Sequence, residues 1–353
     1  MSVRSTSVGL LVALLSAAAF ATSGPFAKSL LEAGWTPGSV VFLRIAGGAA
    51  LLVVPAVRAL DGRWALLRRE WPQVVAYGVS AVAVPQLAFF YAVQHLSVGV
   101  ALLLEYLGLV LVVVWQCLVA RRLPRVQTTL GIVFAVIGLV LVLDAFGGAE
   151  VSGVGVLWGL LAAFGLASYF LLSARSHEHT LPPMALAGGG LVVGGLAFAA
   201  MGASGLLPMT FAAADVTLAG VELPWWLAVL ELAVVAAATA YVTGIAATRV
   251  LGAKLASFVG LSEVMFAVLF AWALLGELPR PVQLLGGLFI LAGVVVVRAE
   301  EERLPLEPEP GPVLGAPVLG DAAEAPDERV DRGRVDVAPT ELERRAVGAM
   351  QDE

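Results

Sequence analysis

Residues 123–127 read LPRVQ and residues 278–283 read LPRPVQ, so one motif occurs twice at an offset of about 155 residues, with one proline inserted in the second copy. The similarity continues beyond the motif. Two glycines of the first copy, Gly131 and Gly138, recur as Gly286 and Gly293. A repeat of this length predicts that the chain is built from two copies of one structural unit.

The composition places both copies in a membrane. The 353 residues are 59% hydrophobic and 14% charged, with a mean hydropathy of +0.92, whereas soluble domains average about 45–50% apolar and about 25% charged residues. The uncharged runs 5–27, 151–174 and 180–214 exceed the roughly 20 residues that cross a bilayer as a helix. These features exclude a water-soluble fold and predict a lipid environment.

Apolar windows between prolines and charged residues predict an all-α membrane protein with ten transmembrane helices. The expected helices cover residues 8–27, 38–60, 72–94, 97–119, 126–144, 154–173, 184–203, 224–246, 252–275 and 281–298. Five helices fall in each copy. Because five is odd, the second copy enters the membrane in the opposite sense, which gives the inverted repeats found in many secondary transporters. We therefore expect repeats at residues 1–148 and 149–298.

The charges predict the orientation of these helices. With the N-terminus in the cytoplasm, the inner segments hold 13 Lys and Arg, and the outer segments hold only Lys28 and Arg280. Such an excess is typical of cytoplasmic loops, so both termini are expected in the cytoplasm. Residues 299–353 contain 15 Asp and Glu against 6 Lys and Arg, and we expect a disordered acidic cytoplasmic tail there. The preference for Arg (19) over Lys (2) suggests a bacterial plasma membrane.

Charged residues at membrane depth are the candidates for function, because each is disfavoured by about 2.5–3.5 kcal/mol on insertion scales. Glu263 lies near mid-depth on a helix face of small residues, which predicts that it faces protein or a cavity. Glu105 and Arg44 lie in the outer half of their predicted helices, and Tyr106 adds an aromatic wall with a hydroxyl. Glu231 is interpreted as mainly structural.

The functional hypothesis is that Glu105 and Glu263 face a central cavity. One carboxylate would bind a proton or the cationic group of a substrate, and Arg44 or Lys28 would balance the charge. Burial away from water favours the neutral form of a carboxyl, as a proton-coupled carrier requires. The alternative is a structural pair between Arg44 and a glutamate that fixes helix packing. Pro85 lies mid-span and predicts a bend that is a candidate for gating.

Four motifs together resemble the EamA-type members of the drug/metabolite transporter superfamily. They are GPFAK at residues 24–28, FLR at 42–44, LLLEYLG at 102–108 and AWALLGE at 271–277. The resemblance covers residues 8–298 and implies ten helices in two five-helix repeats. The sequence departs from many relatives at Leu109 and Val264, where those relatives have proline.

The resemblance implies a secondary transporter that exports a small organic metabolite, either amino-acid-like or drug-like, by alternating access. Proton antiport and facilitated exchange both fit the sequence. An importer or exchanger of phosphorylated sugars or nucleotide sugars is the first alternative, and a membrane scaffold that binds a partner through the acidic tail is the second. The sequence has no Walker loop, HExxH motif or paired cysteines, so we expect no enzyme activity, cofactor, metal or nucleic-acid partner. It leaves the oligomeric state open.

Overall fold

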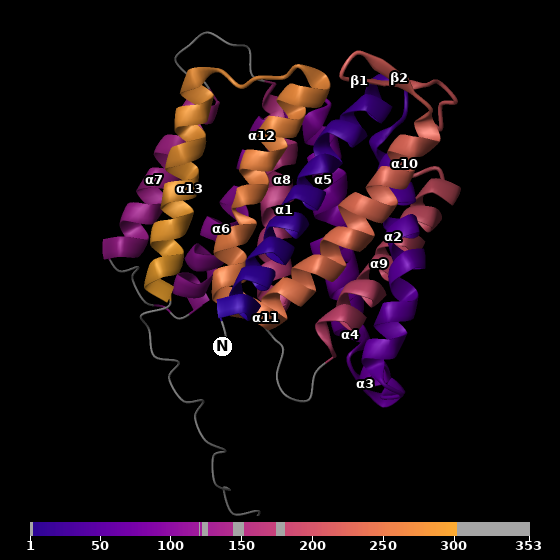
Figure 1. The fold of residues 1–353 in the computed structure, drawn as a ribbon, viewed down its shortest axis with the longest axis horizontal. Helices are drawn as coiled ribbons and strands as arrows, with labels where there is room; N and C mark the ends of the chain where they lie inside the picture. Colours follow the sequence, from indigo (N-terminus) through magenta and orange to yellow (C-terminus); the bar gives the residue numbers. More distant parts are fainter. Residues whose placement is uncertain (1–2, 120, 122–125, 144–151, 174–180, 302–353) are drawn as a thin grey trace, which may run out of the picture. The chain divides into compact units, whose positions relative to one another are not determined.

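The computed structural model describes residues 3–119, 121, 126–143, 152–173 and 181–301, and they form a bundle of helices with a small sheet at one end (Figure 1). The first half of the chain contains α1 (Val3–Glu32), α2 (Pro37–Leu60), α3 (Trp64–Arg69), α4 (Trp71–Ala76), the π-helix η1 (Tyr77–Ala83), α5 (Val84–Val93), α6 (Val98–Val119) and α7 (Val126–Val142). The second half contains α8 (Gly153–Ser173), α9 (Pro183–Ala203), strands β1 (Val216–Leu218) and β2 (Val221–Leu223), α10 (Trp225–Ala233), the π-helix η2 (Val234–Thr239), α11 (Ala240–Gly260), α12 (Ser262–Leu275) and α13 (Pro281–Glu301).

Within these ranges, seven helical segments are long and apolar enough to cross a bilayer. They are α1, α2, the continuous segment 71–93, α6, α8, α9 and the segment 225–252. Three shorter apolar helices, α7, α12 and residues 281–296 of α13, occupy the other positions where the sequence predicts a span.

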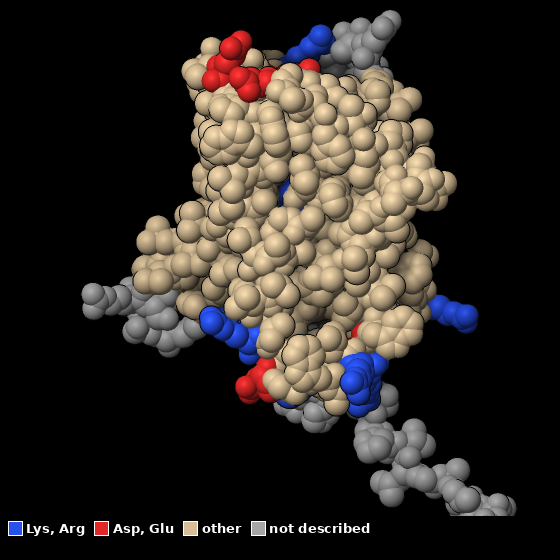
Figure 2. Space-filling view, turned by 90° about the vertical axis from the view of Figure 1, so that its right-hand side faces the viewer, with Lys and Arg blue, Asp and Glu red and all other residues tan. Residues whose placement is uncertain are grey.

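The outer surface of the bundle is apolar. Leu11, Leu118 and Leu157 are exposed over 67%, 67% and 70% of their area. On the face shown in Figure 2, charged side chains gather near the two ends, and the belt between them is almost free of charge. Such a belt is unfavourable in water and suits a hydrocarbon layer.

Helices α7 and α13, the last helix of each half, run antiparallel, as glycine contacts show. A Cβ atom on Gly138 would lie 2.6 Å from the carbonyl oxygen of Gly286, and one on Gly293 would lie 2.5 Å from that of Gly131. Early residues of α7 therefore face late residues of α13, and the reverse. Gly131 and Gly138 are the repeat counterparts of Gly286 and Gly293, so the two contacts exchange when the halves exchange. This is the geometry of an inverted repeat.

The contacts between the other helices show the same symmetry between the two halves. Helix α1 packs against α11 and α12, while α8, its counterpart, packs against α5 and α6. Helix α2 packs against its own counterpart, α9. Helices of each half therefore pack against helices of the other half.

The structure corrects three details of the prediction. The chain is not purely α-helical, because β1 and β2 form an antiparallel hairpin around Ala219 and Gly220, both of positive φ. The single helix predicted over 252–275 is wrong. Gly252, where that helix is predicted to begin, has φ 80°, and the chain breaks inside the predicted helix at Leu261, where the Ser262 hydroxyl donates to the Val259 carbonyl (2.6 Å). Helix α13 also extends three residues into the predicted tail, the rest of which lies outside the described residues.

The third span of each half contains a π-helix at a corresponding position. In the first half η1 ends two residues before Pro85, whose missing N–H frees a backbone carbonyl one turn earlier. In the second half η2 forms without a proline. A π-helix shifts the backbone hydrogen bonds by one residue and is frequent at functional sites. Both π-helices lie beside the cavity described next.

Candidate functional site

A cavity of about 650 Å³ lies between the two halves of the bundle. Its walls come from α1, α2, the 71–93 segment, α6, α8, α9, α11 and α12, and none of its lining residues belongs to α7 or α13. The lining includes Thr248 and Arg249 near the middle of α11, both exposed, so the cavity reaches the surface there. Figure 1 shows that this part of α11 lies at the end of the bundle where α1 begins. We call this end the mouth.

Glu263 lies on the cavity wall and contacts the other half of the chain. Its Oε2 accepts a hydrogen bond from the Tyr106 hydroxyl at 3.1 Å, and the same hydroxyl lies 3.3 Å from the carbonyl oxygen of Gly260. Tyr106 is on α6, whereas Glu263 and Gly260 flank the break between α11 and α12. A single tyrosine proton thus has two acceptors, one on a titratable group and one on the backbone at a helix break.

Arg44 of α2 also lines the cavity, although only 7% of it is exposed. Its Nη1 donates to Gln86 Oε1 (3.0 Å), and its Nη2 donates to the Ala236 carbonyl of η2 (3.1 Å). Its Nε has no hydrogen-bond partner, and the guanidinium carbon lies 5.7 Å from the centre of the Phe90 ring. A guanidinium stays charged at all physiological pH values, so this buried cation is held by neutral groups.

The structure does not contain the structural Arg44–glutamate pair that the sequence left open. Among the described residues, carboxylates lie within 4.0 Å of a cation only in Lys28–Glu277 and Arg69–Glu70. Glu231 instead accepts a hydrogen bond from Thr22 on α1, and its other oxygen is buried without a partner.

Glu105 lines the cavity from α6, directly before Tyr106. The cavity wall therefore holds one buried cation on α2 and two carboxylates, one from each half of the chain. Aromatic side chains supply much of the remaining wall: Phe20, Tyr77, Phe89, Tyr169, Phe170 and Tyr241. The arrangement can bind a small solute with apolar and charged parts.

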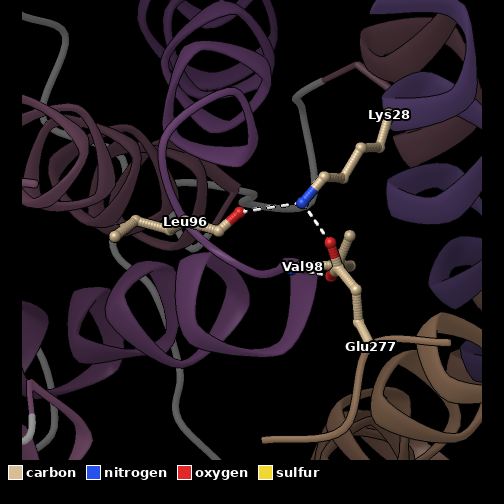
Figure 3. Close-up of polar contacts among 4 residues, drawn as sticks. All are labelled: Lys28, Leu96, Val98 and Glu277. Atoms are coloured by element: carbon tan, nitrogen blue, oxygen red, sulfur yellow. Dashed lines mark hydrogen bonds and ion pairs between the residues drawn. The ribbon is translucent and has the colours of Figure 1, made fainter. Parts of the chain in front are cut away.

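Lys28 lies outside the cavity lining, at the opposite end of the bundle from the mouth. Its ammonium group is paired with the carboxylate of Glu277, and it also lies 3.4 Å from the carbonyl oxygen of Leu96 (Figure 3). The second oxygen of Glu277 accepts a hydrogen bond from the Val98 N–H at 3.1 Å. Pro85, the gating candidate, does line the cavity, where it packs tightly against Gly165 of α8.

Sequence reasoning missed Gln86 and Arg249 as cavity residues and did not pair Glu277 with Lys28. The signal for Gln86 was a polar side chain next to the mid-span proline. Glu277 was visible only as the last letter of a motif, because its partner is 249 residues away in the chain. Among the described residues, no cluster of three His, Cys, Asp or Glu side chains is suited to hold a metal ion.

Comparison with known proteins identifies the family of this chain. No curated protein matches the chain. One solved crystal structure aligns with 86% of this chain and with all of its own, at a TM-score of 0.56 and 20% sequence identity, a likeness that concerns the fold alone. The model of the EamA-like transporter family matches residues 7–144 and again residues 153–299, one match for each half. The chain therefore belongs to the EamA-like transporter family, a family of membrane transporters in the drug/metabolite transporter superfamily.

Proposed function

We propose that this protein is a secondary transporter that exports a small organic metabolite by alternating access. The observation that carries the proposal is the cavity between two inverted repeats, whose wall holds Arg44, Glu105 and Glu263. Inverted-repeat transporters bind their substrates at such an interface and rock one repeat against the other. The proposed repeats are residues 1–148 and 149–298, with ten membrane crossings in total.

The distribution of charge supports an amino-acid-like substrate. A buried guanidinium without a counter-ion is unfavourable, and the carboxylate of a substrate would supply one. The Glu105 and Glu263 carboxylates are suited to bind an ammonium group, and the aromatic wall suits an apolar side chain. A purely cationic drug-like solute would use the carboxylates alone.

Phosphorylated sugars fit this cavity less well. Among the described lining residues the cations are Arg44 and Arg249, and Arg249 is exposed at the mouth. Deeper in the cavity, Glu105 and Glu263 would repel a phosphate when ionised. For this reason the phosphorylated-sugar and nucleotide-sugar alternatives rank below the amino-acid-like class.

The orientation follows from the excess of positive charge on the predicted inner segments. We propose that both termini are cytoplasmic, that the membrane is a bacterial plasma membrane, and that the mouth opens to the cytoplasm. An exporter would load its substrate in this conformation.

Proton coupling is proposed for Glu263, through Tyr106. When the carboxylate is ionised, the Tyr106 hydroxyl donates to it. When the carboxyl is protonated, it can donate to the Tyr106 oxygen, and the tyrosine proton becomes free for the Gly260 carbonyl. The protonation state of Glu263 would then change a hydrogen bond at the break between α11 and α12. The other titratable groups among the described lining residues are Arg44, Tyr77, Glu105, Tyr169 and Tyr241, with Arg249 at the mouth.

The test is solute flux in proteoliposomes that contain the purified chain. A panel of amino acids, amphiphilic amines and sugar phosphates would be loaded, and their release measured with and without a pH gradient. Release of an amino acid that responds to the gradient supports the proposal. Absence of flux for every solute would favour the scaffold alternative, and deletion of residues 299–353 should leave flux unchanged if the protein is a carrier.

A further inference from the structure

The end of the cavity opposite the mouth is closed by a polar cluster that joins the two halves of the chain. The cluster, here called the latch, consists of Lys28 on α1, Leu96 and Val98 at the start of α6, and Glu277 after α12 (Figure 3). Three of these residues belong to the first half and one to the second. The latch therefore crosses the interface that must open if the cavity is to open at this end.

The latch lies directly over the end of the cavity. Val98, whose N–H donates to Glu277, also lines the cavity. Gly24, one turn before Lys28 on α1, lines the cavity too and packs against Val98 so closely that it has no room for a Cβ atom. Rupture of the ion pair would remove the polar contact that joins α1 and the start of α6 to the end of α12.

Each member of the latch depends on the others. The Glu277 carboxylate accepts two hydrogen bonds, one from an ammonium group and one from a backbone N–H at the N-terminus of α6, where the helix dipole favours a negative charge. Side-chain exposures of 16% for Lys28 and 21% for Glu277 limit screening by water. Nearby, the Ala219 N–H of the β hairpin donates to the Leu274 carbonyl of α12 (2.6 Å). The closing contacts therefore converge on the last turn of α12.

The repeat does not conserve the charges of this pair. At the offset of about 155 residues, Arg122 corresponds to Glu277, and at a somewhat shorter offset Arg175 lies roughly opposite Lys28. The counterpart positions of the repeat thus carry two residues of the same charge, which cannot form an ion pair with each other. At these four positions the sequence therefore encodes an attractive pair in one arrangement and like charges in the other.

We propose that the Lys28–Glu277 pair is a releasable latch that sets the resting state of the transporter, with the cavity closed at this end and open at the mouth. The inference rests on the proposed alternating-access function. Transport would require the pair to separate once per cycle, and the strength of the pair would set the fraction of molecules open at either end.

Cysteine accessibility tests the latch without any substrate. In a Cys117→Ala background, Ala21→Cys places one thiol on the cavity wall of α1, two turns before Lys28. A membrane-impermeant thiol reagent is applied in turn to each side of the membrane. With the latch intact, we expect fast labelling from the mouth side and slow labelling from the latch side.

Lys28→Met and Glu277→Gln each remove one charge, and Glu277→Gln keeps an acceptor for the Val98 N–H. Each is expected to raise labelling from the latch side by about tenfold, within the range of a partly buried ion pair. The double variant should match the single variants, because all three remove the same interaction. Lys28→Arg should behave as the wild type. Arg69→Gln, at the exposed Arg69–Glu70 pair, is the matched control and should change nothing.

Unchanged latch-side labelling in folded Lys28→Met and Glu277→Gln proteins, or an equal rise in Arg69→Gln, would overturn the latch. Monodisperse elution and a cooperative thermal transition establish folding, and Glu277→Gln alone supports the comparison if Lys28→Met does not fold. The proposed function fails separately. If labelling changes as expected but the protein shows no flux, the latch proposal stands and the transporter proposal is overturned. If the protein shows flux but labelling is unaltered, the transporter proposal stands and the latch proposal is overturned.

Discussion

The hydroxyl of Tyr106 lies 3.1 Å from Oε2 of Glu263, and this contact connects the fourth span of the first half to the break before α12 in the second half. The two residues are 157 positions apart in the chain. They meet because the inverted halves place α6 and α12 on the same cavity. A titratable group at the interface of the repeats is thereby linked to the backbone that must move if the repeats rock.

Replacement of Glu263 by Gln should abolish the pH dependence of transport. The amide keeps the size of the side chain and cannot exchange a proton, so the rate should no longer follow a pH gradient and should fall by at least about tenfold. Flux would be measured in proteoliposomes over a series of internal and external pH values. Glu32→Gln, at an exposed position near the end of α1, is the control. A pH response preserved in Glu263→Gln would contradict the coupling role.

Tyr106→Phe removes the hydroxyl and keeps the ring. The loss of a hydrogen bond to a carboxylate is expected to reduce the free energy of unfolding by about 1–2 kcal/mol and to slow transport several-fold. Thermal unfolding in detergent and flux would be measured together. Tyr91→Phe is the matched control, since Tyr91 stacks on Trp158 at 4.5 Å outside the cavity lining. Equal effects of both variants would argue against a special role of Tyr106.

Arg44→Met should separate a binding role from a structural one. Replacement of a buried cation by an apolar side chain of similar length is often neutral for stability, so the free energy of unfolding should change by no more than about 1 kcal/mol. Transport of a carboxylate-bearing solute should fall by at least about tenfold, and transport of the matched amine should fall much less. A large loss of stability with parallel losses for both solutes would show that Arg44 mainly supports helix packing.

Gly138→Ala should weaken the contact between α7 and α13. The new Cβ would lie 2.6 Å from the Gly286 carbonyl oxygen and 2.7 Å from backbone and side-chain atoms of Ile290, so the helices must separate, at a cost of about 1–3 kcal/mol. Thermal unfolding measures the loss. Gly153→Ala, at the exposed start of α8 with no atom within 4 Å of the new Cβ, should leave the transition unchanged.

Much of the architecture could be read from residues close together in the chain. The LPRVQ and LPRPVQ motifs and their following glycines predicted two halves, and the structure places those glycines in reciprocal contact between α7 and α13. The apolar windows predicted most helix bounds to within a few residues. The predicted helices 224–246 and 252–275 placed a joint just before Gly252, where Arg249 and Lys254 interrupt the apolar run. The break at Leu261 was not predictable in the same way, because apolar composition continues across it.

The candidate site was also predictable only in part. Local sequence marked Arg44, Glu105, Tyr106 and Glu263, because charged and polar groups inside apolar windows are rare and need an explanation. Their partners lie far away in the chain: Arg44 binds an η2 carbonyl, and Lys28 turns away from the cavity to pair with Glu277. Which candidate faces the cavity depends on how the helices rotate and pack.

Composition and periodicity alone determined that this chain lies in a bilayer as two inverted copies of one helical unit. Both the apolar runs that partition into lipid and the repeated motifs are properties of residues close together in the sequence. Only the tertiary structure decided that Arg44 lies beyond ion-pairing distance of every carboxylate among the described residues, that Tyr106 links Glu263 to Gly260, and that Lys28 pairs with Glu277 of the other half. Those relationships join residues of different helices over a few ångströms. Their distances are set by packing between helices, which no local pattern encodes.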